Sequence, residues 1–249
     1  MLATPTVDKL RSLGLLAMAE GLLRQRESAN IDDLGFEDRL GLLADLEHTA
    51  RDSRRLERRL RECHLRIPAC LEDVEAANSR GIDQSVLLGF GDAAWIRRHE
   101  GVIITGACGT GKTFLACALA HSACRQDYSA RYYRTARLME ELTLARAQGT
   151  WARVLGRLGR IEVLVLDEFA MTPLDAQQSR DLLEVIDDRS ERRTTVVASQ
   201  FPVEKWHEAL GDPTVADAVM DRVVHGAYRF ELRGESQRKV RAARAGAET

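Results

Sequence analysis

Eight consecutive residues have the types and spacing of a loop that wraps around phosphate groups. They read Gly106-Ala107-Cys108-Gly109-Thr110-Gly111-Lys112-Thr113 and fit the pattern G-x-x-x-x-G-K followed by Ser or Thr. The glycines let the backbone turn its N–H groups inward around anionic oxygens at the start of a helix. The lysine of such a loop reaches the β- and γ-phosphates, and the threonine hydroxyl binds Mg²⁺. We therefore predict that ATP and Mg²⁺ bind here.

A second group of chemically active residues follows an apolar run. Val163-Leu164-Val165-Leu166 is followed directly by Asp167 and Glu168, and ligand sites of α/β proteins lie at the carboxyl ends of buried strands. We predict that Asp167 and Thr113 hold Mg²⁺, and that Glu168 polarises the attacking water as a general base. The predicted nucleotide-binding residues are Gly106, Ala107, Cys108, Gly109, Thr110, Gly111, Lys112, Thr113, Phe114 and Asp167.

Two further polar positions are candidates for the same reaction. Gln200 (or Ser199) follows another apolar run. If that strand lies beside the other two, this residue would sit between the acids and the phosphate and orient water; the alternative is a polar cap of a strand end. Arg222, next to Asp221 near a helix end, would reach a neighbouring subunit's nucleotide as an arginine finger; the alternative is a surface ion pair. The predicted catalytic residues are Lys112, Glu168, Gln200 and Arg222.

The elements that position these residues alternate between short apolar runs and helical periodicity from about residue 82 onward. Strands are expected at Val102–Thr105, Ala130–Tyr133, Ile161–Leu166, Thr194–Ala198 and Tyr228–Leu232. Helices are expected at Gln84–Arg98, Phe114–Arg125, Ala136–Ala147, Arg153–Arg160 and Ala176–Arg189, and another ends in Val219–Val224. This alternation predicts an α/β fold with a parallel sheet covered by helices on both faces.

The region before the sheet has a different pattern. Residues 1–66 read as all-helical, including a long helix from Phe36 to Cys63 whose last turns are rich in arginine. We predict a small N-terminal domain for interaction or DNA targeting at 1–66. A connector at 67–81 and an ATPase domain with a basic tail at 82–249 follow it.

Charge is unevenly distributed although the net charge is only −2. Residues 51–66 carry an excess of four positive charges, residues 131–160 an excess of five, and the tail from Arg233 an excess of three. Such patches on a nearly neutral chain are typical of a surface that binds a polyanion. Solvated helix faces are the alternative explanation.

Composition excludes several other classes. The sequence has no apolar run of the roughly 18 residues that a membrane span needs, and no secretory signal pattern. Its five cysteines include no C-x-x-C pair, which favours reduced thiols of a cytoplasmic protein over disulfides or zinc. Cys117 and Cys124 are expected in the core, whereas Cys108 lies in the phosphate loop without an evident reason.

Together these motifs resemble the IstB-like ATP-binding proteins, which are helper ATPases of bacterial insertion sequences. The loop, Asp167-Glu168, Ser199-Gln200, Asp221-Arg222 and the closing Gly234–Arg238 carry the resemblance. It implies a P-loop NTPase fold of the AAA+ type, related to the helicase loader DnaC. It also implies a homo-oligomer joined through the nucleotide interface, binding to double-stranded DNA and a transposase partner. Gln200 departs from the Asn that is common at the strand-end sensor of that class.

The resemblance also suggests which arginines contact DNA, because related ATPases place DNA-facing elements between the two nucleotide motifs. The candidate DNA contacts are Arg134, Arg137 and Arg153 in that region, Arg54 and Arg58 in the first basic patch, and Arg238 in the closing motif. For Arg238, phosphate sensing and DNA contact are both open.

Three other functions also use a phosphate loop. A replicative helicase loader would use the same chemistry with a hexameric helicase as partner. A nucleotide-gated scaffold would bind ATP and DNA with negligible hydrolysis. A small-molecule phosphotransferase is disfavoured, because neither a lid-like arginine cluster nor an acceptor pocket is evident and the N-terminal helices would lack a purpose.

Overall fold

The computed structural model describes residues 5–28, 31–74, 81–234 and 236. Contacts divide the chain into two compact units, residues 1–58 and 59–249. Every helix among the described residues is too short or too polar to cross a bilayer.

The first unit is helical, as predicted. It contains α1 (Pro5–Ser12), α2 (Leu16–Glu27), a short 3-10 turn η1 (Ile31–Asp33) and the first part of α3 (Phe36–Cys63). Val7, Ala19 and Leu43 are its buried apolar side chains. The buried Glu47 carboxylate accepts hydrogen bonds from the backbone N–H groups of Ala17 and Met18. This contact satisfies donors that the first turn of a helix otherwise leaves unpaired.

Helix α3 runs past the end of the first unit, and its last residues, 59–63, belong to the second unit. Arg59 pairs with Asp127 over 2.5 Å, and Arg131 donates to the Glu62 carbonyl oxygen over 2.7 Å. Cys63 is fully buried, and a hydrogen bond with the Cys124 thiol, followed by burial, raises its pKa. The boundary between the two units therefore lies inside α3, between residues 58 and 59, and not at residue 66. The roles assigned to the predicted domains stay predictions.

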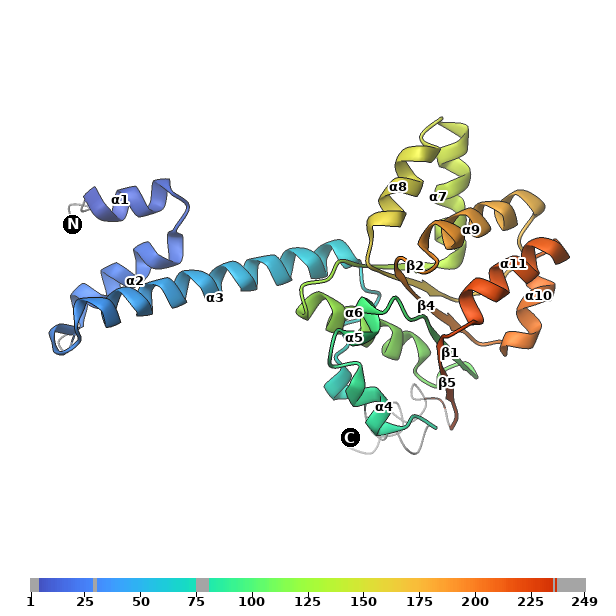
Figure 1. Cartoon of the computed structure of the whole chain (residues 1–249), viewed down its shortest axis with the longest axis horizontal. Helices are drawn as coiled ribbons and strands as arrows, with labels where there is room; N and C mark the ends of the chain where they lie inside the picture. The colour runs from blue at the N-terminus through green and yellow to red at the C-terminus, as the bar shows by residue number, and fades with distance from the viewer. Residues whose placement is uncertain (1–4, 29–30, 75–80, 235, 237–249) are drawn as a thin grey trace, which may run out of the picture. The chain divides into compact units, whose positions relative to one another are not determined.

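The second unit is built on a five-stranded sheet with the order β2-β3-β4-β1-β5 (Figure 1). The strands are β1 (Val102–Gly106), β2 (Ala130–Arg134), β3 (Val163–Asp167), β4 (Thr194–Ser199) and β5 (Tyr228–Leu232). All neighbouring pairs are parallel. The parallel sheet predicted from the short apolar runs is therefore confirmed.

Helices cover both faces of this sheet. They are α4 (Gln84–Gly89), α5 (Ala94–Arg97), α6 (Lys112–Arg125), α7 (Thr135–Ala147), α8 (Trp151–Arg160), α9 (Ala176–Arg189), α10 (Trp206–Ala209) and α11 (Pro213–Val224), with 3-10 turns η2 (Leu71–Asp73) and η4 (Val203–Lys205). Ile103, Leu164 and Val197 pack into one core with side chains of α7, α8, α9 and α11. Because strand side chains alternate between faces, Val102 and Val165 face the other way, toward α6.

The prediction of one helix over Gln84–Arg98 is wrong. The segment forms α4 and α5, separated at Phe90–Ala93. Phe90 lies 5.1 Å from the Trp95 ring and 5.6 Å from the Phe230 ring, and Asp92 Oδ1 accepts the Ala94 N–H over 2.7 Å to begin α5. The free energy gained by burying the Phe90 ring and by capping the start of α5 exceeds the free energy that would be gained by extending α4.

Arg189 at the end of α9 is buried with 1% of its surface exposed. Its guanidinium donates to the carbonyl oxygens of Leu158, Ile161 and Thr194 over 2.6 to 2.7 Å. Burial lowers the Arg189 pKa to about 9, so the group is charged at neutral pH. It ties the end of α8 to the starts of β3 and β4, at the sheet edge opposite the phosphate loop.

Candidate nucleotide site

Glycine is required at three positions of the phosphate loop. Gly106, Gly109 and Gly111 have φ angles of 144°, 85° and 103°, in the region that side chains disfavour. A Cβ on Gly106 would also lie 2.3 Å from the Leu232 carbonyl oxygen. Gly111 caps α6, so the loop delivers the first N–H groups of that helix to a bound anion.

Lys112 lies over the loop that it follows. Its ammonium donates to the Ala107 carbonyl oxygen over 2.7 Å, and the buried Thr110 hydroxyl donates to the same oxygen over 2.9 Å. Burial lowers the Lys112 pKa from its ordinary value. An ammonium held at this place is available to phosphate oxygens that enter the loop.

Asp167 at the end of β3 is the centre of a hydrogen-bond network. Thr113 and Tyr132 each donate a hydroxyl to Asp167 Oδ2 over 2.7 Å, and the Glu168 N–H donates to Oδ1 over 2.8 Å. Only 2% of Asp167 is exposed. Burial, followed by the bond to Asp167, raises the Tyr132 pKa, so this phenol remains a donor at neutral pH.

These side chains fit a magnesium ion. Mg²⁺ prefers hard oxygen ligands and is commonly held by one or two protein oxygens together with phosphate oxygens and water. The Thr113 hydroxyl and the Asp167 carboxylate supply two such oxygens at the mouth of the phosphate loop. They are the groups that would hold the metal.

Glu168 projects from a backbone turn directly after β3. Its φ angle is 57°, and the next N–H, of Phe169, donates to the Ala198 carbonyl oxygen on β4 over 2.9 Å. The side chain is 39% exposed, and Oε1 accepts from Arg66 Nη1 over 2.7 Å. Hydrogen bonds to Glu168 and then to Tyr132 raise the Arg66 pKa.

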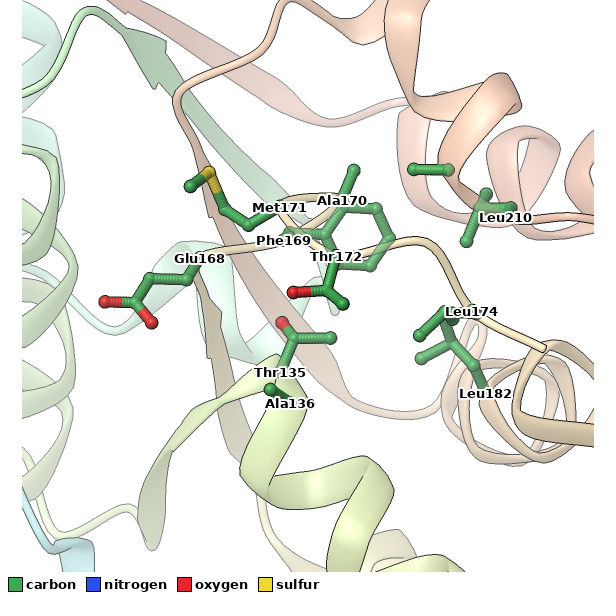
Figure 2. A pocket seen from close by; sticks show the side chains of 11 residues that line it. Thr135, Ala136, Glu168, Phe169, Ala170, Met171, Thr172, Leu174, Leu182 and Leu210 are labelled. Carbon is green, nitrogen blue, oxygen red and sulfur yellow. The ribbon is translucent and has the colours of Figure 1, made fainter.

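A small cavity of about 40 Å³ lies beside Glu168, between the starts of α7 and α9. Figure 2 shows Leu174, Leu182 and Leu210 together at one end of it and the Glu168 carboxylate pointing away from them. Ligand pockets usually measure about 300–1,000 Å³, so this cavity is too small for a nucleotide. The carboxylate instead lies on the side of Arg66 and Asp167.

The strand order brings the Ser199-Gln200 pair close to the acidic residues. β4 lies between β1 and β3, which is the arrangement that the predicted role of Gln200 requires. The buried Ser199 hydroxyl donates to the Phe169 carbonyl oxygen over 2.7 Å and accepts the Phe201 N–H over 3.1 Å. Ser199 is therefore used to brace the turn at Glu168, and water orientation by Gln200 stays a prediction.

Arg222 does not lie at the phosphate loop of its own chain. It stands near the end of α11, just ahead of β5, at the edge where the parallel strands begin. Its Nε donates to Asp187 Oδ1 on α9 over 2.6 Å. Any contact that Arg222 makes with a nucleotide must therefore be with that of another subunit.

The candidate DNA contacts are dispersed over both units. Arg54 in the first unit pairs with Glu47, and Arg58 is the last residue of that unit. Arg134 ends β2, Arg137 on α7 pairs with Glu140, and Arg153 is exposed on α8. Arg238 lies outside the described residues. DNA binding by any of them stays a prediction.

Four residues at the site were not singled out from the sequence for a role there. Tyr132 and Thr135 bond to Asp167, Arg66 bonds to Glu168, and Ser236 lies so close that a Cβ on Gly109 would be 2.2 Å from its hydroxyl. Tyr132 lies within β2, the strand next to β3, which is a usable signal. Arg66 and Ser236 come from segments distant in the sequence, and no sequence pattern indicates that they lie at this site.

Comparison with solved structures identifies the fold. The chain is similar to the crystal structure of DnaI, with a TM-score of 0.57 and 22% identity over 70% of this chain and 91% of that chain. It is also similar to AMPPCP-bound DnaA from Aquifex aeolicus, with a TM-score of 0.58 and 16% identity over 74% of this chain and 56% of that chain. The second unit thus has the P-loop NTPase fold of the AAA+ type.

Sequence comparison identifies the family. The insertion sequence ATP-binding protein y4pL of Sinorhizobium fredii is 44% identical over 239 residues, covering 96% of this chain and 98% of that protein. The IS1162 ATP-binding protein of Pseudomonas fluorescens is 41% identical over 203 residues, covering 81% and 88%. The family described as IstB-like ATP binding protein matches residues 8–245, which confirms the resemblance seen in the motifs. The chain therefore belongs to the IstB-like ATP-binding protein family.

Proposed function

We propose that this protein is an ATPase that helps transposition by assembling on double-stranded DNA and engaging a transposase. The observation that carries the proposal is the convergence of the phosphate loop with Asp167 and Glu168 at one sheet edge. The names of the relatives, which are ATP-binding proteins of insertion sequences, support the biological context. A cytoplasmic location goes with this proposal.

The side chains divide the reaction between them. Lys112 neutralises the β- and γ-phosphates, and Thr113 and Asp167 hold Mg²⁺, which when bound spreads the charge that develops on the phosphate oxygens. Glu168 accepts the proton of the attacking water through a carboxylate oxygen. Gln200 orients that water, and Arg222 of a neighbouring subunit completes the site. ATP then stabilises subunit contacts, and hydrolysis resets the assembly.

Hydrolysis tests the chemical part. Phosphate release from Mg²⁺–ATP is measured for the wild type, Lys112→Ala and Glu168→Gln, with and without DNA. We expect Lys112→Ala to lose ATP binding and ATP-dependent oligomers, and Glu168→Gln to bind ATP but lose turnover by about 10²-fold or more. An unchanged rate in Glu168→Gln would favour the scaffold with negligible hydrolysis and reject the general base.

Partner capture tests the biological part. The protein should retain a transposase when the two are mixed with DNA and ATP. Retention of a replicative helicase instead would favour the helicase-loader alternative. DNA affinity should fall steeply with salt if the arginines neutralise phosphates, and a salt-independent affinity would exclude them as contacts.

A further inference from the structure

Arg66 contacts the residue to which the proposed function gives the general-base role. Its Nη1 donates to Glu168 Oε1 over 2.7 Å, and both side chains keep somewhat more than a third of their surface exposed. Hydrogen bonding to the Tyr132 hydroxyl, after that to Glu168, also raises the Arg66 pKa. Through Tyr132 it joins the network that holds Asp167. Arg66 therefore bonds to one acidic residue directly and to the other through one phenol.

The backbone around Arg66 is anchored to the helix that begins at the phosphate loop. Burial raises the pKa of the Cys117 thiol on α6, and hydrogen bonding from the backbone N–H groups of Ile67 and Arg66 opposes that rise. Further along, Glu72 in η2 pairs with Arg125 at the end of α6 over 2.5 Å. The segment is thus attached to α6, and among its described residues, 64–74, Arg66 is the one whose side chain bonds to Glu168.

The same segment follows directly from α3. That helix begins at Phe36 in the first unit and ends at Cys63, three residues before Arg66. Its end is held by Arg59–Asp127 and by Arg131 on the Glu62 carbonyl oxygen. A displacement of the end of α3 that breaks these two contacts would act next on Arg66.

We infer that Arg66 is a positioning residue that restrains Glu168, and that its release lets Glu168 act on water. This inference rests on the proposed function of Glu168. The Glu168 Oε1 oxygen that accepts from the Arg66 guanidinium is occupied, so it is not free to accept the proton of a water molecule. The contact therefore opposes proton transfer without opposing nucleotide binding. Motion of α3 offers a route by which events at the first unit control hydrolysis.

The test compares Arg66→Ala and Arg66→Gln with Arg125→Ala. The control removes a second arginine–glutamate pair of this segment, Glu72–Arg125, which joins it to α6 and does not involve Glu168. Single-turnover hydrolysis is measured for the full-length protein with and without DNA, and affinity is measured with a non-hydrolysable ATP analogue. We expect both Arg66 variants to raise the DNA-free rate by about two- to fivefold, the range that an exposed ion pair supplies.

In the same variants the stimulation by DNA should shrink by a similar factor. Affinity for the analogue should stay within about twofold, because Arg66 does not bond directly to the phosphate loop or to Asp167. Arg66→Lys, which keeps one charge, should restore part of the restraint. An unchanged or lower rate in the Arg66 variants, or an equal rise in Arg125→Ala, would overturn the inference. Hydrolysis at the wild-type rate in Glu168→Gln would instead reject the proposed function itself.

Discussion

The hydroxyl groups of Thr113 and Tyr132 converge on a single oxygen, Asp167 Oδ2, each over 2.7 Å. One hydroxyl belongs to the phosphate loop and the other to β2, so the buried carboxylate joins the loop to the sheet. Two donors on one oxygen also restrain its rotation. The Asp167 side chain is thus held in place before any ligand binds to it.

Tyr132→Phe tests how much this arrangement contributes. Removing the phenol deletes one of the donors to a nearly buried carboxylate, so we expect the free energy of unfolding to fall by about 1–2 kcal/mol. Urea unfolding measures it. Tyr128→Phe is the control, because the Tyr128 hydroxyl makes no hydrogen bond within the described part of the chain, and it should stay within about 0.5 kcal/mol of the wild type. Equal losses in the two variants would contradict the assigned bond.

Gly106→Ala should damage the loop more than its small size suggests. The new Cβ would lie 2.3 Å from the Leu232 carbonyl oxygen, and residue 106 has a φ of 144°. The substitution therefore causes both a steric clash and backbone strain. We expect destabilisation of about 1–3 kcal/mol and weaker binding of a fluorescent ATP analogue. Gly156→Ala on α8, where the added Cβ meets no atom within 4 Å, should be neutral or stabilising. A neutral Gly106→Ala would show that the loop can relax.

The parts of this site that the sequence predicts correctly depend on short-range spacing. The pattern from Gly106 to Thr113 and the run that ends in Asp167 each lie within one strand and the turn after it. Buried parallel strands must be apolar on both faces. Ligand sites of parallel sheets lie at the carboxyl ends of their strands, which places both motifs at one edge.

The parts that are missing from the prediction depend on contacts between distant segments. Arg66 belongs to a basic patch, and no local pattern indicates that it reaches Glu168. The helix break at Phe90 has the same origin, because its reason is an aromatic cluster completed by Tyr228 and Phe230. Tertiary packing overrides local propensity at such positions.

Acidification should weaken the fold through His121. Burial, then the charge of Arg125, lowers the His121 pKa despite the opposing charges of Glu72 and Asp73. Below about pH 6.5 the unfolded chain binds a proton that the folded chain does not, so stability falls as pH falls through that value. In urea unfolding, the free energy of unfolding of His121→Asn should therefore fall less between about pH 7 and pH 5.5 than that of the wild type. A steeper loss would contradict the direction of the shift.

Mixing two inactive variants tests whether Arg222 acts on a neighbouring subunit. Arg222 is paired with Asp187 at the edge opposite its own phosphate loop, so Arg222→Ala should bind ATP normally but lose most of its turnover, by about 10²-fold or more. Lys112→Ala should fail to bind ATP but still present its arginine. Mixed subunits should then regain part of the phosphate-release rate, because some interfaces join an intact loop to an intact Arg222. Asp187→Asn, which loses the pair within the chain and keeps the arginine, is the matched control and should remain active. Two results would show that the site is complete within one chain: mixtures that stay inactive, or wild-type turnover by Arg222→Ala measured without the second variant.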